Sequence, residues 1–168
     1  MRAAEAFVIR VATAADDVAL GRLDSAAFSA GGAFPSSVVA PGEPFFSQRN
    51  PPEVHLVADA GGDVLGYVRV QQQIEELPEN VHVLAIHGLA VAPAAQRRGV
   101  ATALMLGAES MARDRGARKL SLRMFADNDS ARALYERLGY VVEGVLREEF
   151  LINGEYVDDV LMTKWLNR

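Results

Sequence analysis

Residues 89–102 read LAVAPAAQRRGVAT, and they connect two runs whose apolar patterns differ. The run that leads into them, Val81–Val91, is almost continuously apolar, which is typical of a central β-strand covered on both faces. The run that follows repeats its apolar residues at helical spacing and predicts a helix from about Gly99 to Arg115. We therefore expect a strand, a loop and a helix in direct succession.

The loop between this strand and this helix has the chemistry of an anion-binding site. Gly99 lets the backbone curl closely around a bulky anion, and the small Ala101 leaves room beside it. The first amides of a helix have no partners within the helix, and the dipole adds about half a positive charge at that end. A diphosphate matches such an end, and Arg97 and Arg98 would add charge-assisted hydrogen bonds. Taken alone, the spacing Gln-x-x-Gly-x-Ala also occurs in capped surface turns whose arginines are solvated.

On both sides of this segment the sequence alternates between strand and helix patterns. Gly61–Gly62 and Asn153–Gly154 each separate two β-rich runs and predict hairpins. The further strands are expected at 7–11, 54–59, 64–70, 118–125, 141–152 and 155–165, and the further helices at 13–28 (capped by Thr13) and about 127–138. Residues 29–52 lack periodicity, so they form either a loop with a short helix or a connector with aromatic residues tucked inward.

This order of elements predicts the fold class. We expect a mixed α/β sheet of about seven strands with flanking helices, and one right-handed crossover between the fourth and fifth strands. The chain has 168 residues, half of them hydrophobic, which fits one domain spanning 1–168.

The composition excludes several classes of function. The net charge is −5 and no dense Lys/Arg run is present, which argues against a nucleic-acid binder. The absence of cysteine excludes a disulfide scaffold, a thiolate metal site and a cysteine nucleophile. The histidines, His55, His82 and His87, form no close pair at metal-ligand spacing, so we expect no bound metal. Since no apolar stretch suits a secretion signal or a membrane span, we expect a cytoplasmic protein without membrane contact.

A second pattern, NDSARALYERLGY, occupies residues 128–140, and together the two patterns resemble a known family. The segment Val83–Tyr140 is similar to the acetyl-CoA-binding core of the GCN5-related N-acetyltransferase (GNAT) superfamily. In that family Gln/Arg-x-x-Gly-x-Gly/Ala carries the pyrophosphate loop, and Asn-x-x-Ala-x-x-Leu-Tyr-x-x-x-Gly-Phe/Tyr follows it. The matching residues here are Gln96, Gly99 and Ala101 for the first motif, and Asn128, Ala131, Leu134, Tyr135, Gly139 and Tyr140 for the second.

The resemblance implies that acetyl-CoA is a co-substrate held by the strand, the loop and the second motif. The backbone of Leu89–Val91 would hydrogen-bond the pantetheine arm, and the fourth and fifth strands would separate to admit co-substrate and amine from opposite sides. The implied co-substrate-binding residues are Leu89, Ala90, Val91, Gln96, Arg97, Arg98, Gly99, Val100, Ala101, Thr102, Asn128, Ser130, Ala131 and Tyr135.

The resemblance also implies roles in catalysis. The backbone N–H near Leu89 would bind the oxyanion, and Tyr135 would protonate the departing thiolate, although Tyr135 also fits the apolar stripe of its helix as a core aromatic. Some family members use a strand glutamate as the base, where this sequence has Arg123. His87 resembles a strand histidine used by other members, and it is either the base or a buried histidine satisfied by a backbone carbonyl.

We therefore expect an N-acetyltransferase that acetylates a primary amine of a small molecule or peptide N-terminus by direct attack in a ternary complex. Glu148, Glu149, Asp158 and Asp159 would either attract a cationic amine or form a solvated edge. The alternative function is a catalytically weak acyl-CoA sensor, because the strand glutamate is missing. A Rossmann-type domain is disfavoured because no Gly-x-Gly-x-x-Gly follows the first strand. Exposed edges in the last two strands would allow a homodimer.

Overall fold

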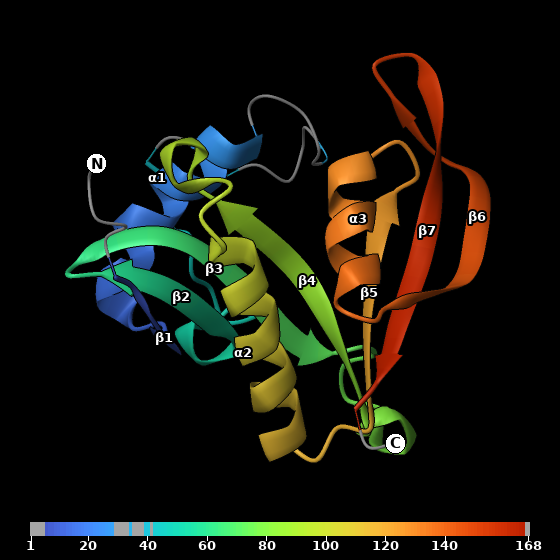
Figure 1. Ribbon diagram of the computed structural model, residues 1–168, viewed down its shortest axis with the longest axis horizontal. Helices are drawn as coiled ribbons and strands as arrows, with labels where there is room; N and C mark the ends of the chain where they lie inside the picture. Colours follow the sequence, from blue (N-terminus) through green and yellow to red (C-terminus); the bar gives the residue numbers. More distant parts are fainter. Residues whose placement is uncertain (1–5, 29–33, 35–38, 41, 167–168) are drawn as a thin grey trace. The chain divides into compact units, whose positions relative to one another are not determined.

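The computed structural model describes residues 6–28, 34, 39–40 and 42–166. Its strands form one seven-stranded sheet in the order β1-β2-β3-β4-β5-β7-β6, which confirms the predicted α/β class (Figure 1). The strands are β1 (Val8–Val11), β2 (His55–Ala60), β3 (Asp63–Gln72), β4 (Val83–Val91), β5 (Lys119–Phe125), β6 (Val141–Ile152) and β7 (Glu155–Trp165). The helices are α1 (Asp17–Phe28), α2 (Val100–Asp114) and α3 (Asp129–Arg137).

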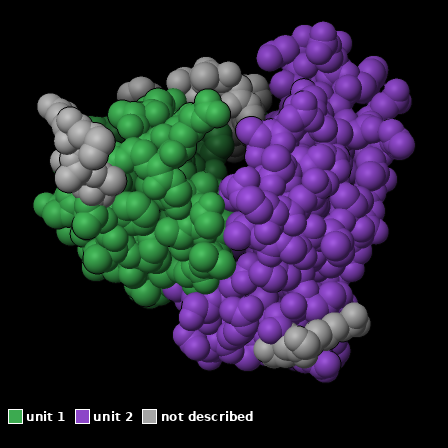
Figure 2. Space-filling model, viewed as in Figure 1, with its two compact units in different colours: residues 1–70, 88–108 green, residues 71–87, 109–168 purple. Residues whose placement is uncertain are grey.

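The chain divides into two compact units, coloured separately in Figure 2. The first unit comprises Met1–Val70 and Gly88–Ala108, and the second comprises Gln71–His87 and Glu109–Arg168. Both β4 and α2 contribute residues to each unit. That the whole chain forms one domain stays a prediction.

Both hairpins predicted from Gly61–Gly62 and Asn153–Gly154 are present. Gly61 and Gly62 have φ of 68° and 105°, and they join β2 to β3 through the pair Ala60–Asp63. Asn153–Gly154 likewise joins β6 to β7 with both φ angles positive. Two consecutive positive φ angles match the right-handed twist of paired strands, which is why these dipeptides are reliable signals.

The first helix begins later than its predicted cap. Thr13 is followed by a 3-10 turn over Ala14–Asp16, and the α-helix proper starts at Asp17. Thr13 is the N-cap of this 3-10 turn, and the carboxylate of Asp16 accepts its backbone N–H at 2.8 Å, so the predicted capping residue caps the turn that leads into α1. In the predicted loop at 29–52, residues 29–33, 35–38 and 41 lie outside the described residues. The described part from residue 42 to 51 holds turns and the bridge Ser47–Asn50, and the side chain of Phe45 there is buried.

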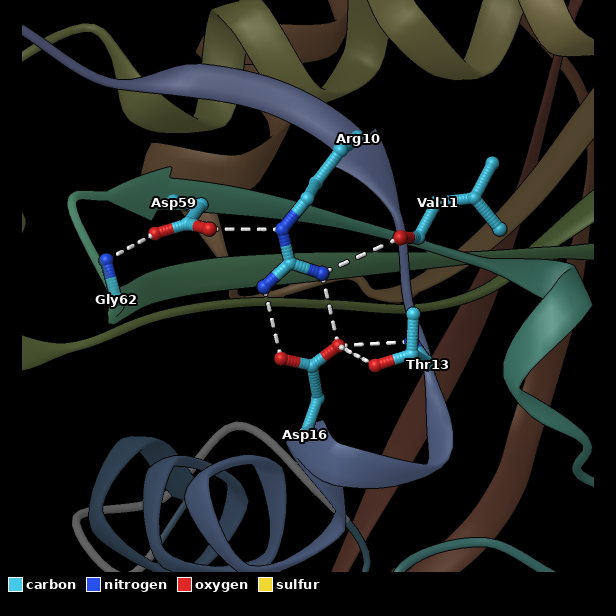
Figure 3. Close-up of polar contacts among 6 residues, drawn as sticks. All are labelled: Arg10, Val11, Thr13, Asp16, Asp59 and Gly62. Atoms are coloured by element: carbon cyan, nitrogen blue, oxygen red, sulfur yellow. Dashed lines mark hydrogen bonds and ion pairs between the residues drawn. The ribbon is translucent and has the colours of Figure 1, made fainter.

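Figure 3 shows how Arg10 of β1 lies between two carboxylates in the first unit. Its Nε donates to Asp59 at 2.7 Å, and its two terminal nitrogens each donate to Asp16 at 2.8 Å. Asp59 also accepts the N–H of Gly62 at 2.7 Å. Hydrogen bonding from Arg10 lowers the pKa of Asp16 from 3.8 to about 2, and the two carboxylates raise the pKa of Arg10. The cluster ties β1 to β2 and to the turn before α1.

The core of the first unit is rich in aromatic rings. Leu20 and Leu23 of α1 are buried in the same cluster as Tyr67 of β3. The ring of Phe45 lies at the centre, 5.3 Å from His55 and 5.2 Å from Tyr67, in edge-to-face arrangements. The apolar spacing of α1 therefore serves to cover one face of β2 and β3.

In the second unit, β5 lies between β4 and β7 and pairs with both strands. Val83–Ile86 of β4 pair with it in parallel, and β7 pairs with its whole length in the antiparallel sense. Alternate residues of β5 are almost fully buried, namely Leu120, Leu122 and Met124. The residues between them, Ser121, Arg123 and Phe125, lie on the opposite face and are half-buried or exposed.

Candidate functional site

The loop after β4 has a backbone shaped for an anion. A 3-10 turn over Pro93–Ala95 ends β4, and α2 begins at Val100. Between them, Arg97 and Gly99 take positive φ of 61° and 82°. Alternation of left-handed residues with others turns successive N–H groups toward one side, as in anion-binding nests. A side-chain carbon added to Gly99 would meet no heavy atom within 4 Å, so the loop is open at this point.

The amides of this loop are available for a ligand. Ala95 and Gln96 donate their N–H groups to carbonyls of the 3-10 turn, and Ala103 donates to Gly99 at 3.0 Å. Within the described part of the chain, no acceptor receives a hydrogen bond from the backbone N–H groups of residues 97–102. These amides, with the exposed side chains of Arg97 and Arg98, form a donor set that fits a diphosphate.

The strand before the loop is held close to its neighbour by a glycine. A side-chain carbon at Gly66 of β3 would lie 2.7 Å from the carbonyl oxygen of Ala90 and 3.1–3.2 Å from Leu104 and Val100. The N–H of Ala92 also donates to the carbonyl of Leu65 at 2.8 Å. The end of β4, which includes the expected pantetheine-binding residues 89–91, is thus packed against β3 and the first turns of α2.

The second motif forms the start and body of α3 in the second unit. Asn128 is the N-cap, and its side-chain oxygen accepts the N–H of Ala131 at 3.1 Å and the hydroxyl of Ser130 at 3.2 Å. Helix capping by Asn128 is therefore sufficient to explain an asparagine at this position of the motif, without any contact to a ligand. The co-substrate contacts expected of Asn128, Ser130 and Ala131 stay predictions.

Tyr135 and Tyr140 differ in the surroundings of their hydroxyls. Both side chains are buried, and their ring centroids lie 6.0 Å apart. Burial raises the pKa of Tyr135 from 10 to about 12, so its hydroxyl stays protonated at neutral pH. The hydroxyl of Tyr140 is fully enclosed and has no hydrogen-bond partner among the described residues, which marks Tyr140 as a core residue. Tyr135 remains the candidate acid of the pair.

His87 and Arg123 follow the last paired residues of β4 and β5. The parallel ladder runs from Val83–Lys119 to Ile86–Leu122, and these two residues come next along their strands. His87 is exposed, so the alternative of a buried histidine is wrong as to burial. The backbone-carbonyl contact of that alternative is present, because Nε2 lies 3.4 Å from the carbonyl oxygen of Gln72. Its role as the base stays a prediction.

The predicted acidic cluster is largely neutralised by arginines. Asp158 accepts from Arg147 at 2.8 Å, and Asp159, only 2% exposed, accepts from Nε of Arg123 at 2.5 Å. Glu148 has a φ of 52° in a bulge of β6, and its N–H donates to Asp158 at 2.8 Å. The aspartates therefore hold β6 and β5 to β7.

Two buried polar groups of the first unit were not found from the sequence. The hydroxyl of Tyr67 donates to Asp24 at 2.6 Å, and burial raises the pKa of Tyr67. His55 is fully buried, and its Nδ1 lies 2.9 Å from the carbonyl of Pro51. The one available signal was Asp24 itself, a carboxylate next to Leu23 on the apolar side of its helix.

Among the described residues, no three acidic or histidine side chains are grouped so as to hold a metal ion. No helix in these residues is both long and apolar enough to cross a membrane.

Characterised proteins similar to this chain include two N-acetyltransferases. The L-amino acid N-acetyltransferase AaaT of Escherichia coli is 36% identical over 111 residues, which are 65% of this chain and 66% of the relative. The spermidine N(1)-acetyltransferase of Vibrio cholerae is 34% identical over 118 residues, 67% of this chain and 65% of the relative. The matches therefore span just under two thirds of the length of these relatives.

Solved structures share the whole fold. A ribosomal-protein-alanine N-acetyltransferase from Brucella melitensis has a TM-score of 0.78 at 24% identity, covering 95% of this chain and 99% of its own. A GNAT superfamily phosphinothricin acetyltransferase from Sinorhizobium meliloti, in complex with acetyl-CoA, has a TM-score of 0.77 at 19% identity, covering 95% and 88%.

A family profile decides the assignment. The profile of the acetyltransferase (GNAT) family matches residues 23–140, which contain the loop at 97–102 and the motif at 128–140. The predicted resemblance is thereby confirmed. The chain belongs to the GNAT family of acetyltransferases.

Proposed function

We propose that this chain transfers the acetyl group of acetyl-CoA to a primary amine of a small molecule or of a peptide N-terminus, by direct attack in a ternary complex. The observation that carries the proposal is the row of unpaired amides at residues 97–102, inside the span matched by the family profile. The names of the relatives refer to L-amino acids, spermidine and ribosomal-protein alanine, so they support the reaction class and leave the acceptor open.

The co-substrate-binding task falls to backbone more than to side chains. The amides at 97–102 would hold the diphosphate of acetyl-CoA, with Arg97 and Arg98 adding charge from the exposed side of the loop. The backbone of residues 89–91 would pair with the pantetheine arm. Bound in this way, acetyl-CoA supplies an activated thioester.

The chemical task is divided among three groups of this chain. The amine must lose a proton before it attacks, and His87 would accept that proton directly or through water. The N–H near Leu89 would stabilise the oxyanion. Tyr135, whose pKa is raised by burial, stays protonated and would donate its proton or a hydrogen bond to the departing thiolate.

The experiment that tests the function follows free thiol while purified protein is incubated with acetyl-CoA and a panel of amines. We expect thiol release that depends on at least one amine, with the acetylated amine identified by mass spectrometry. If thiol release stays at the rate without amine for every acceptor, the transferase assignment fails.

The co-substrate site is tested by two matched glycine variants. Gly99 and Gly116 flank the same helix, have φ of 82° and 80°, and both have open space where a side chain would go. Gly99→Val and Gly116→Val therefore impose similar backbone strain. Only Gly99→Val should weaken acetyl-CoA binding, by about tenfold or more in isothermal titration. Equal affinities in the two variants would place the diphosphate elsewhere.

A second candidate function is an acyl-CoA-binding module with little catalysis. The observation in its favour is Arg123, which occupies the position of a catalytic glutamate in some family members and is paired with Asp159. This candidate predicts tight acetyl-CoA binding in the titration and no amine-dependent thiol release. The two measurements together therefore separate it from the transferase.

A further inference from the structure

Arg123 occupies an unusual place for a charged residue. It is the first residue of β5 beyond its parallel pairing with β4, and His87 is the corresponding residue of β4. It lies on the half-open face of β5, between Ser121 and Phe125, while the alternate residues of the strand are buried. Arg123 therefore follows the parallel ladder on β5 as the proposed proton acceptor His87 follows it on β4.

The guanidinium is fixed in orientation and yet half exposed. Its Nε donates to Oδ2 of Asp159 at 2.5 Å, and Nη2 contacts the same oxygen. Asp159 is 2% exposed, whereas the side chain of Arg123 is 51% exposed. One edge of the guanidinium therefore holds Asp159, and no described residue accepts a hydrogen bond from Nη1 on the other edge. An arginine preorganised in this way offers a planar pair of donors that suits a carboxylate.

A carboxylate and two aromatic rings lie beside this guanidinium. Oε1 of Glu149 is 4.0 Å from Nη2 of Arg123, and the side chain of Glu149 is 41% exposed. The ring of Phe150 lies 6.0 Å from the guanidinium carbon and 5.9 Å from the ring of Phe125, edge to face. Positive charge, negative charge and apolar surface thus meet within a single unit of the chain.

We propose that Arg123 and Glu149 select an α-amino acid as the acetyl acceptor, Arg123 binding its carboxylate and Glu149 its ammonium group before transfer. This assignment rests on the proposed function and names the acceptor class for the same reaction. The amino and carboxyl groups of an α-amino acid share one carbon, so their separation matches two opposite charges that lie 4.0 Å apart. The rings of Phe125 and Phe150 favour an apolar side chain.

The charges argue against the other amines. Arg123, Asp159 and Glu149 sum to −1, so a simple anion gains little, and a zwitterion can satisfy both exposed charges at once. A polyamine has no carboxylate for the open edge of Arg123 and would bring a further ammonium toward it. A purely structural role for Arg123 would explain its ion pair with Asp159. It would not explain why the other edge of the guanidinium is exposed and ready to donate hydrogen bonds.

The test compares acceptors that differ only in the carboxylate. L-phenylalanine, L-phenylalaninamide and 2-phenylethylamine are assayed by thiol release, with leucine, leucinamide and isopentylamine as a second series and spermidine as the polyamine. We expect kcat/KM for each amino acid to exceed that of its decarboxylated amine by about tenfold or more, because a lost charge-assisted carboxylate contact costs at least that factor.

Variants assign the preference to Arg123. The double variant Arg123→Gln, Asp159→Asn removes the guanidinium without leaving a buried charge unpaired. It should raise KM for the amino acids, abolish their preference over the decarboxylated amines, and leave KM for acetyl-CoA unchanged. Arg147→Gln removes the neighbouring Arg–Asp pair of the same hairpin and should keep the wild-type preference.

The outcomes separate the two proposals. The acceptor assignment would be overturned if the decarboxylated amines or spermidine were used as well as the amino acids. It would also be overturned if the preference for amino acids survived in the double variant. Either result would leave the proposed acetyltransferase activity intact. Absence of thiol release with every acceptor would overturn both.

Discussion

Replacing His55 with phenylalanine is expected to make the stability of this protein less sensitive to acid. The imidazole is fully buried, and its Nδ1–H donates to the carbonyl of Pro51, since a carbonyl oxygen can only accept. Its Nε2 is enclosed, and no residue that the structure describes forms a hydrogen bond with it. Because burial penalises the charged form, the pKa of His55 falls from 6.5 to about 4.

The size of the effect follows from that shift. A folded-state pKa below the unfolded value means that the stability is fully present above pH 6.5 and is lost as the pH falls toward 4. At pH 5 nearly every unfolded chain binds a proton at this residue while few folded chains do. This difference in proton binding lowers the free energy of unfolding by about 2 kcal/mol between pH 7 and pH 5.

The phenylalanine ring retains the packing against Phe45 and Phe46, whose centroids lie 5.3 Å and 5.4 Å from that of His55. Urea unfolding of both proteins at pH 7 and pH 5 measures the free energy of unfolding. The wild type should lose about 2 kcal/mol more than His55→Phe over this interval. The exposed His82 supplies the control, because His82→Gln removes an imidazole without touching the buried rings. An equal loss in the wild type and in His55→Phe would refute the proposed burial of an uncharged histidine.

Other predictions concern catalysis and ion pairs. Tyr135→Phe should lower turnover in the thiol-release assay and leave the titrated affinity for acetyl-CoA nearly intact; unchanged turnover would remove Tyr135 from the mechanism. With a pKa of about 12, Tyr135 should also contribute no alkaline loss of rate below pH 10. Asp16→Asn should cost about 1–2 kcal/mol at neutral pH, because the hydrogen bond from Arg10 lowers the pKa of Asp16 to about 2. That stability is present above pH 3.8 and is lost as the pH falls toward 2, so denaturation curves of variant and wild type should converge there. Lys164→Met should cost about 3 kcal/mol in urea unfolding, since it leaves Glu109, which is 3% exposed and 2.8 Å from the ammonium, without its main partner. A loss below about 1 kcal/mol would show that the ion pair between Lys164 and Glu109 contributes little to stability.

Local signals were sufficient for much of the fold. The Gly61–Gly62 and Asn153–Gly154 turns, the apolar run of β4 and the stripe of α2 each involve residues within a few positions of one another. Their predicted bounds differ from the observed ones by one or two residues. The loop at 97–102 was predictable for the same reason, because a helix start after a buried strand needs no distant contact to expose its amides.

Contacts between distant residues were not predictable from one sequence. Arg10 and Asp59 are 49 positions apart, and Asp24 and Tyr67 are 43 apart, so no local pattern signals either pair. The acidic residues near Asp158 looked like one electrostatic feature, but their partners are arginines on other parts of the sheet. The exposure of His87 likewise depends on where the pairing of two strands ends.

The close approach at Gly66 has a consequence for how this family member tolerates change. A methyl group there would press on the carbonyl of Ala90 and on the first turns of α2 at once, since the nearest atoms lie at 2.7 Å and 3.1–3.2 Å. Both ends of the diphosphate loop would move together, although residue 66 touches no expected ligand. Gly66→Ala, a small substitution in the interior, would then weaken acetyl-CoA binding although residue 66 is not part of the expected binding site.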